Sequence, residues 1–364
     1  ERDNFRSALQ WLLPRGRDGM RVNPILFPVE QSNEAGTASK ASPLGTTTTE
    51  PLAIELYLRL TAALRPYWEW QGYLTEGRDW LKAGLDLPLE NGVEQPVLAA
   101  RAKALSEAAR LVCLQNSQGR ALELVEESIA LWKQLNDNRG LAGAMLHRGW
   151  ANHAKGDYEA AKSAYWEGMR LLSPADDPWL YAELGFHLAA AAGFTFDFEQ
   201  MRSLYTESKA LFEQAGDKSA VADLLKDQGG MSILESKYTE AIDCLLESIN
   251  LCYGMNHMQF ITTGIGWLSF AVGMKDDPTP EQASIRSARL GGAAEGLQEA
   301  IGLTPWAKTH PLVQAVRQYI RSKVGESDWN AAWAAGKALT LEQTIDLVNR
   351  LGAELPPAEQ NRLD

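Results

Sequence analysis

Apolar positions recur along most of the chain at the three- and four-residue spacing of amphipathic α-helices. In 156-GDYEAAKSAYWEGMRLL-172, a turn signal precedes Ala161, Tyr165 and Gly168, which share one helix face. Asp177 before Pro178 predicts a helix start. The pattern predicts an all-α protein, with breaks between helices at 136-NDNRG-140, 155-KGD-157, 173-SPADDP-178, 216-GDK-218 and 255-MNH-257.

One order of residue types recurs at a fixed interval of about 40 residues, within the range of helical repeat proteins. A small residue is followed nine positions later by a usually aromatic one, twelve later by a usual alanine, and nineteen later by another small residue. The four series are Ala109, Gly149, Ala189 and Gly229; Gln118, Tyr158, Phe198 and Tyr238; Ala121, Ala161, Met201 and Ala241; and Ser128, Gly168, Ser208 and Ser248. Because small residues let two helices cross closely, each unit is predicted to be a helical hairpin whose repeated residues serve core packing.

Weaker copies extend this array in both directions. One hairpin is expected at 52–85, and another at 258–273 and 283–302, with an insertion at 274–282. Helices near 311–323, 326–338 and 340–351 are expected to cap the last apolar face. We therefore expect a connector helix at 1–14, a flexible linker or insertion at 15–50, about six hairpins at 51–302, and capping helices with a tail at 303–364.

The order small, aromatic, alanine resembles the tetratricopeptide repeat, here with a period longer than the usual 34 residues. This resemblance implies a superhelical solenoid of tetratricopeptide-like hairpins with a C-terminal helical cap. Three further stretches narrow the resemblance: 1-ERDNFRSALQWLL-13, 70-WQGYLTEGRDWLKAGL-85, and 287-SARLGGAAEGLQEAIG-302 with 329-WNAAWAAGKALTLEQTIDL-347. Together they resemble the C-terminal sensor of signal-transduction ATPases with numerous domains (STAND), of the bacterial LuxR-like, antibiotic-regulator-like and adenylate-cyclase-linked types.

In such proteins a ligand or partner on this arm relieves inhibition of the ATPase, which then oligomerises and drives an output such as transcription. The resemblance therefore implies a bacterial, non-catalytic sensor or protein-interaction domain that contacts ATPase domains of its parent protein. Residues 15–50 depart from the family pattern, because members of the family usually have only a few residues between the opening helix and the first repeat. Their richness in Ser, Thr, Gly and Pro predicts a flexible linker or loop. The apolar patch 23-NPILFPV-29 within them could dock on the repeats.

Catalytic and metal motifs are not found in the sequence. It contains no G-x-x-x-x-G-K-[ST], no G-x-S-x-G, and no C-terminal helix-turn-helix that we can identify. Glu107, His147, His187 and Asp227 occupy one position in successive units, but equivalent positions in stacked repeats lie about 10 Å apart, too far to share one zinc ion. We expect no enzymatic activity, no cofactor and no metal site.

Composition restricts the partners further. The chain of 364 residues has a net charge of −12, which argues against nucleic-acid binding. No apolar run is long enough to span a membrane, no signal-peptide pattern opens the chain, and three cysteines give no disulfide framework, so a cytoplasmic location is expected. Because the chain starts at Glu1 rather than Met, we expect a fragment of a longer protein.

The concave surface of such a stack is lined mainly by the first helix of each hairpin, and carrying this over predicts the groove. Its lining is expected to be Arg65, Trp68, Lys103, Ser106, Arg110, Cys113, Leu146, Trp150, His153, Glu183, Phe186, Phe194, Asp223 and Lys226. Mixed charges and aromatic anchors suit a peptide or protein segment, although Trp150, Phe186 and Phe194 could equally stack on a sugar or another small inducer. Trp150 and Phe186 could also pack between hairpins only.

Two other functions fit the repeats. A free-standing tetratricopeptide adaptor or scaffold would bind peptides without any ATPase, and a pheromone-type receptor would close its superhelix on a small peptide. The opening DNFRSALQW segment favours the sensor arm, because a free adaptor has no need of that connector.

Overall fold

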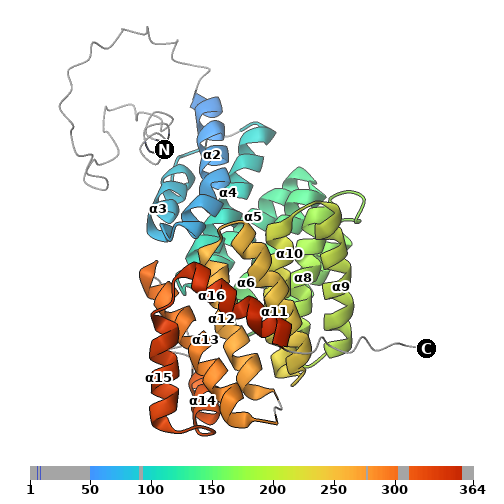
Figure 1. Ribbon diagram of the computed structural model, residues 1–364. Coiled ribbons are helices and arrows are strands. Elements are labelled where there is room, and N and C mark those ends of the chain that lie inside the picture. Colours follow the sequence, from blue (N-terminus) through green and yellow to red (C-terminus); the bar gives the residue numbers. More distant parts are fainter. Residues whose placement is uncertain are drawn as a thin grey trace, which may run out of the picture. The chain divides into compact units, whose positions relative to one another are not determined.

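The structure is a computed structural model, shown in Figure 1. It describes Arg6, Leu9 and residues 50–89, 93–275, 278–301 and 311–354. These residues form α-helices joined by short turns, with no strand among them, which confirms the all-α prediction. Apart from Arg6, Leu9 and Glu50, the expected connector at 1–14, the linker at 15–50 with its patch 23–29, and the tail after 354 lie outside the described residues.

Helices follow the predicted repeat closely, and the expected breaks all fall at helix boundaries. The elements are α2 (Glu50–Trp70), α3 (Leu74–Leu85), α4 (Gln95–Leu114), α5 (Gln118–Leu135), α6 (Asn138–Lys155), α7 (Tyr158–Arg170), α8 (Pro178–Phe194), α9 (Phe198–Gln214), α10 (Lys218–Leu234), α11 (Tyr238–Gly254), α12 (Met258–Met274), α13 (Pro280–Ala300), α14 (Pro311–Arg321), α15 (Glu326–Lys337) and α16 (Leu341–Glu354). The usually aromatic position of each predicted unit is the first residue of α5, α7, α9 or α11.

The chain divides into two compact units at Ala191 and Ala192, near the end of α8. Unit 1 contains α2 to α7 and most of α8, and unit 2 contains the end of α8 and the helices that follow. The domain boundaries expected at residues 14, 50 and 302 stay predictions.

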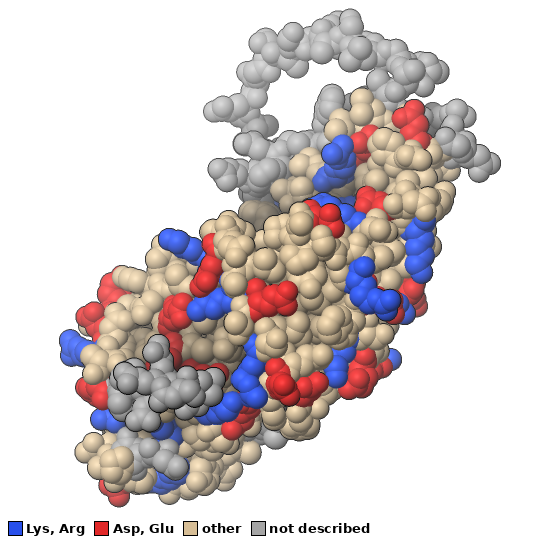
Figure 2. Space-filling model, turned by 90° about the vertical axis from the view of Figure 1, so that its right-hand side faces the viewer, with Lys and Arg blue, Asp and Glu red and all other residues tan. Residues whose placement is uncertain are grey.

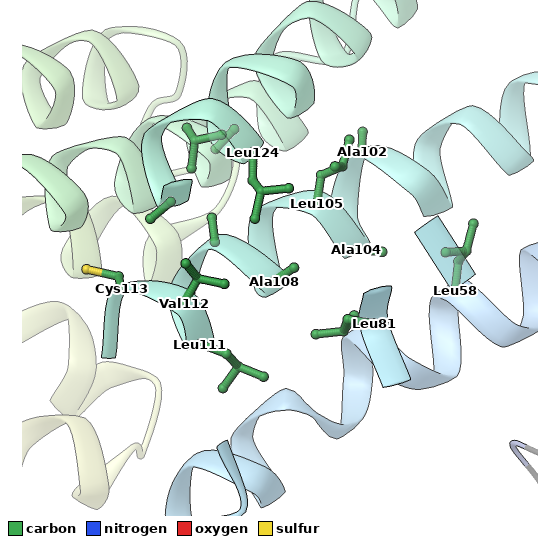
Figure 3. Close-up of a cluster of buried hydrophobic side chains, with 14 of the residues drawn as sticks. Leu58, Leu81, Ala102, Ala104, Leu105, Ala108, Leu111, Val112, Cys113 and Leu124 are labelled. Carbon is green, nitrogen blue, oxygen red and sulfur yellow. The ribbon is translucent and has the colours of Figure 1, made fainter. Parts of the chain in front are cut away.

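In unit 1, consecutive helices pack as the hairpins α2/α3, α4/α5 and α6/α7, and the first helices α2, α4 and α6 pack side by side. Leucines and alanines of these helices form one core, which Figure 3 shows from close by. A Cβ atom on Gly149 would lie 2.2 Å from the Tyr165 ring, so α6 and α7 meet where only glycine fits. Ser128 also joins a hairpin, since its hydroxyl donates to the carbonyl of Ala102 at 2.7 Å.

The turns repeat with the helices. A left-handed residue stands between the two helices of successive hairpins, at Asn116, Gly156, Phe196 and Ser236, which keep the interval of the sequence repeat. Helices α6, α8, α10 and α12 each begin with an N-cap side chain, and these caps keep the same interval at Asp137, Asp177, Asp217 and His257. The predicted cap at Asp177 is confirmed, because its carboxylate accepts from the Leu180 amide at 3.0 Å.

In unit 2, the C-terminal helices cover the last hairpin. Ile345 and Leu351 of α16 join the core of α11, α12 and α13, and Ile320 and Trp329 pack against Phe270. Helix α15 lies against α13 at very short range through glycines on both helices. The predicted capping helices are therefore present, each within a few residues of its expected bounds.

Candidate functional site

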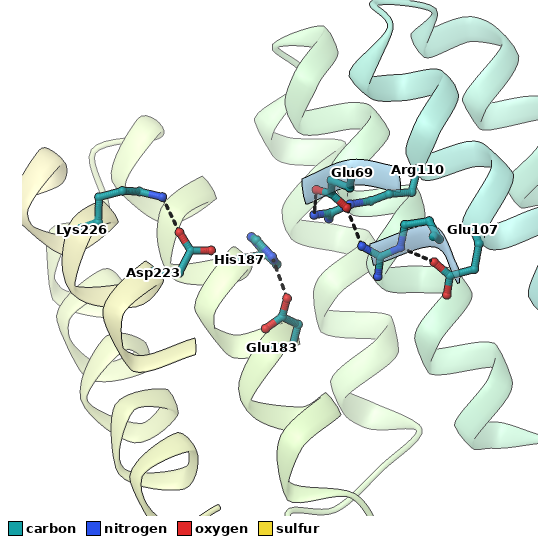
Figure 4. A network of polar contacts seen from close by, with 8 residues as sticks. Glu69, Glu107, Arg110, Glu183, His187, Asp223 and Lys226 are labelled. Atoms are coloured by element: carbon teal, nitrogen blue, oxygen red, sulfur yellow. Dashed lines mark hydrogen bonds and ion pairs between the residues drawn. The ribbon is translucent and has the colours of Figure 1, made fainter. Parts of the chain in front are cut away.

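A group of five charged side chains lies on the first two hairpins of unit 1, and we call it the polar cluster: Arg65, Glu69, Lys103, Glu107 and Arg110. Figure 4 shows Glu69, Glu107 and Arg110 among its members. They come from α2 and α4, which pack side by side. Three of the five were predicted to line the groove, and all lie within unit 1.

Each carboxylate of the polar cluster is held by two cations. Glu69 accepts from Arg110 Nη2 at 2.7 Å and is also paired with Arg65 one helical turn before it. Glu107 accepts from Arg65 Nε at 2.8 Å and lies 2.7 Å from Lys103 Nζ. The polar cluster therefore contains three cations and two anions and has a net charge of +1. The whole chain, by contrast, has a net charge of −12.

Burial makes these pairs electrostatically strong. Burial alone raises the pKa of Glu107, but His147, Lys103 and Arg65 hold it at about 2. Burial likewise raises the pKa of Glu69, and Arg110 and Arg65 reverse that effect, so it lies below its usual range. Both carboxylates are therefore charged at neutral pH, and α2 is bonded to α4 through ion pairs.

A second group of side chains continues from Arg110, and we call it the aromatic cluster: Trp150, Tyr165, Phe186 and His187. The Arg110 guanidinium carbon lies 3.1 Å from the centre of the Trp150 ring, a cation–π contact. The Trp150 ring meets the His187 ring edge-on, with ring centres 4.8 Å apart. Helices α4, α6, α7 and α8 thus each place a side chain around one spot.

The polar members of the aromatic cluster are deeply buried. Tyr165 is 0% exposed, and burial raises the pKa of its hydroxyl well above the usual value. His187 is 9% exposed, and its Nε2 lies 3.4 Å from a carboxylate oxygen of Glu183, the contact drawn in Figure 4. Phe186 completes the group with its ring centre 4.6 Å from that of His187.

Several predicted groove residues are buried in the core, and Trp68 and Phe186 are the largest of them. Trp68 is 3% exposed and its ring lies against Gly77 of α3, so it packs within the first hairpin. Phe186 is 2% exposed, because it faces the interior of unit 1. The other predicted residues of unit 1 fall into three classes: Ser106, Cys113 and Leu146 are buried; Arg65, Arg110, Trp150, His153 and Glu183 are half-buried; and Lys103 is exposed.

The remaining predicted residues belong to unit 2. Phe194 is exposed at the end of α8. Asp223 and Lys226 form an ion pair on α10, and the Lys226 ammonium lies 4.4 Å from the centre of the Phe260 ring. Burial alone lowers the pKa of Lys226, but Asp223 and Asp227 reverse this and raise it above its usual value. Whether any of these residues binds a ligand stays a prediction.

The sequence did not lead us to Glu69 and Tyr165 as members of the site, and it suggested Glu107 and His187 only as possible metal ligands. Glu69 could have been found, because it stands four residues after Arg65, the spacing at which opposite charges pair on a helix. His147 was considered only as a metal ligand, yet its Nδ1 lies 2.8 Å from the Ser106 hydroxyl. Among the described residues, no three His, Cys, Asp or Glu side chains are grouped as metal ligands.

Acid is expected to destabilise unit 1 through His147. Burial lowers the pKa of this imidazole to about 3, against the attraction of Glu107, so the folded state keeps it neutral where the unfolded state binds a proton. Stability is therefore lost as the pH falls from about 6.5 towards 3, with a slope of up to about 1.4 kcal/mol per pH unit. Urea unfolding of the wild type and His147→Gln between pH 7 and pH 4 measures this, and equal slopes would contradict it.

Surface charge is mixed. On the face that Figure 2 shows, basic and acidic side chains are interspersed. Among the described residues, we find no helix with the length and hydropathy needed to cross a bilayer.

Comparison with known proteins identifies the fold. No family model matches the chain, and no curated protein matches it in sequence. Among solved structures it is similar to a signal-transduction ATPase with numerous domains that has a tetratricopeptide-repeat sensor, from Pyrococcus horikoshii, with a TM-score of 0.52 and 12% sequence identity. The match covers 83% of this chain and 45% of that protein, so this chain spans less than half of its length. At this identity the likeness concerns the fold alone: the chain has the all-α, tetratricopeptide-like fold of such a protein.

Proposed function

We propose that this chain is the non-catalytic sensor and interaction arm of a bacterial STAND-type regulator. It binds a peptide, a protein segment or a small inducer at the polar and aromatic clusters of unit 1, and binding controls signalling or transcription in the cytoplasm. The similarity in fold to a STAND protein with a tetratricopeptide-repeat sensor supports this proposal.

The observation that carries the proposal is the position of the two clusters. Helices α2, α4 and α6 pack side by side, so Arg65, Arg110 and Trp150 stand on neighbouring first helices. All three side chains are half-buried, so they combine access to solvent with a fixed geometry. Aromatic rings and arginines in such settings are the side chains that contribute most to binding energy.

The opening segment supports the connection to a parent protein. Arg6 Nε donates to the Glu76 carboxylate of α3 at 2.7 Å, and Leu9 is 1% exposed within the core of unit 1. Both partners of this ion pair belong to stretches that resemble the STAND sensors, although they stand 70 residues apart. A connector that packs on the first hairpin can transmit a change in that hairpin to whatever precedes it in the parent protein.

The mechanism follows from the pairing within the polar cluster. Arg65 and Arg110 already bind Glu69, so a ligand that takes over the same guanidinium donors loosens their contact with that carboxylate. Such a ligand prefers the arrangement of α2 and α4 in which the arginine is available, and shifts the population towards it. The contact of the arm with the ATPase domains of the parent would then change.

A thermal-shift screen of the chain against peptides, oligosaccharides and nucleotides tests the proposal. A ligand at 100 times its dissociation constant adds about 2.7 kcal/mol to the free energy of unfolding, which raises the melting temperature by several degrees. The shift should be lost in Arg110→Ala and Trp150→Ala and kept in Arg120→Ala, whose side chain is exposed on α5. A folded chain that no class stabilises would count against a ligand-binding arm.

A further inference from the structure

Three buried polar atoms of the aromatic cluster have no hydrogen-bond partner among the residues that the structure describes: Trp150 Nε1, the Tyr165 hydroxyl and His187 Nε2. Buried polar groups in folded proteins are almost always hydrogen-bonded, and a buried group without a partner destabilises the fold. Glu183 is close to His187, but its carboxylate is not oriented to accept a hydrogen bond from Nε2. Three such atoms in one cluster therefore need an explanation.

The rings that carry these atoms pack on one another around His187. The ring centre of His187 lies 4.8 Å from that of Trp150 and 5.9 Å from that of Tyr165. The three atoms belong to α6, α7 and α8, so it is the packing of these helices that brings their side chains together. Trp150 is half-buried, so part of its side chain is accessible to solvent.

The charges beside the three atoms are of both signs. Arg110 stacks on Trp150, and Glu183 faces His187. Both also act electrostatically on the Tyr165 hydroxyl, Arg110 favouring its ionised form and Glu183 opposing it. A singly charged ligand would be attracted by one of these side chains and repelled by the other, whereas an uncharged group is repelled by neither, so an uncharged group fits best.

The hydrogen-bonding capacity of the atoms defines that group further. An indole N–H only donates, so the ligand must accept a hydrogen bond from Trp150. A tyrosine hydroxyl both donates and accepts, and imidazole nitrogen does either according to its tautomer. Hydroxyl groups and primary amides are the uncharged groups that both accept and donate.

We propose that Trp150 Nε1, the Tyr165 hydroxyl and His187 Nε2 form a recognition site for a small uncharged molecule that carries a hydroxyl or primary amide group. The site deepens the proposed function and rests on it, since it places the polar group of the inducer. The accessible part of the Trp150 ring accommodates the body of the molecule, and Arg110 links the site to the polar cluster.

Calorimetric titration with two neutral probes and their charged counterparts tests the proposal. Nicotinamide carries a primary amide and nicotinate a carboxylate in its place; glucose carries hydroxyls and gluconate adds a carboxylate. We expect at least one neutral probe to bind with a dissociation constant on the order of 10 mM or tighter, and its charged counterpart to bind at least about tenfold more weakly. Which neutral probe binds distinguishes an amide ligand from a hydroxylated one.

Tyr165→Phe is the decisive variant, because it removes one hydroxyl that has no hydrogen-bond partner within the described part of the chain. The neutral probe should bind about tenfold more weakly, while the melting temperature of the free protein stays the same or rises by about 2 °C. Tyr205→Phe is the matched control, since Tyr205 stands at the equivalent position of the next repeat and is also fully buried. It should leave probe binding unchanged.

Three outcomes would overturn the site: neither neutral probe binds, the charged counterpart binds equally well, or Tyr165→Phe binds as the wild type does. If a peptide still stabilises the chain and Arg110→Ala abolishes that effect, the sensor proposal stands and only the uncharged-ligand site is wrong. If no compound of any class stabilises the folded chain, the sensor proposal itself fails.

Discussion

Gly336→Ala is expected to lower the free energy of unfolding of unit 2 by about 2 to 3 kcal/mol. A Cβ atom on Gly336 of α15 would lie 1.9 Å from the carbonyl oxygen of Arg289 on α13, where backbone must move because no flexible side chain can yield. Gly292 of α13 makes the reciprocal approach, with a Cβ position 2.1 Å from the Trp333 carbonyl oxygen. Urea unfolding followed by circular dichroism measures the loss, and amide exchange in α15 locates it.

Gly266→Ala provides the control within the same unit. Gly266 lies inside α12, and a Cβ atom there would meet nothing within 4 Å. Alanine is the better helix former by about 1 kcal/mol, so this variant should be more stable than the wild type. Equal effects from the two substitutions would mean that α13 and α15 do not approach closely.

Glu107→Gln should destabilise unit 1 by about 3 kcal/mol at neutral pH, because it removes a buried charge from two cations and leaves them facing each other. The Glu107 side chain is 4% exposed, so little solvent screens its pair with Arg65, which is 21% exposed, whereas its pair with Lys103, which is 57% exposed, is screened more. A lowered carboxylate pKa stabilises the fold above the unfolded value and loses that effect as the pH falls towards about 2. The difference between wild type and variant should therefore shrink between pH 5 and pH 3.

Glu123→Gln is the surface counterpart. Glu123 pairs with Arg120 one turn away on α5, but both side chains are more than half exposed, at 64% and 58%. Such pairs contribute from about zero to 1 kcal/mol, so this variant should unfold almost as the wild type does. A cost at Glu107 no greater than that at Glu123 would show that the polar cluster does not hold α2 to α4.

The positions of the hairpins could be predicted from the sequence because the physics that sets them is local and repeated. Small residues such as Gly149 mark helix crossings, and capping residues such as Asp177 mark helix starts. Each signal lies within a window of a few residues and recurs in the next repeat. A wrongly placed helix boundary would therefore have disagreed with the spacing of about 40 residues in the other repeats.

The site was harder to predict, because burial of a charge depends on partners that are distant in sequence. Glu107 stands among helical alanines, and nothing near it shows that Arg65, 42 residues earlier, binds its carboxylate. Trp68 illustrates the converse error. The position suited a groove, but Gly77 on the following helix leaves room for its indole ring, which is therefore buried.

The left-handed turn residues at Asn116, Gly156, Phe196 and Ser236 have a consequence for how such a chain can change in length. Four different side chains occupy the same backbone geometry, so the turn tolerates drift in sequence as long as the spacing is kept. If one whole repeat is inserted or deleted with its ends at two of these turns, the new junction is again such a turn. The helix caps and helix crossings of the other repeats are then unchanged. Recombination between repeats can therefore lengthen or shorten this array in one step, and the product still has the spacing of caps and crossings that the fold needs.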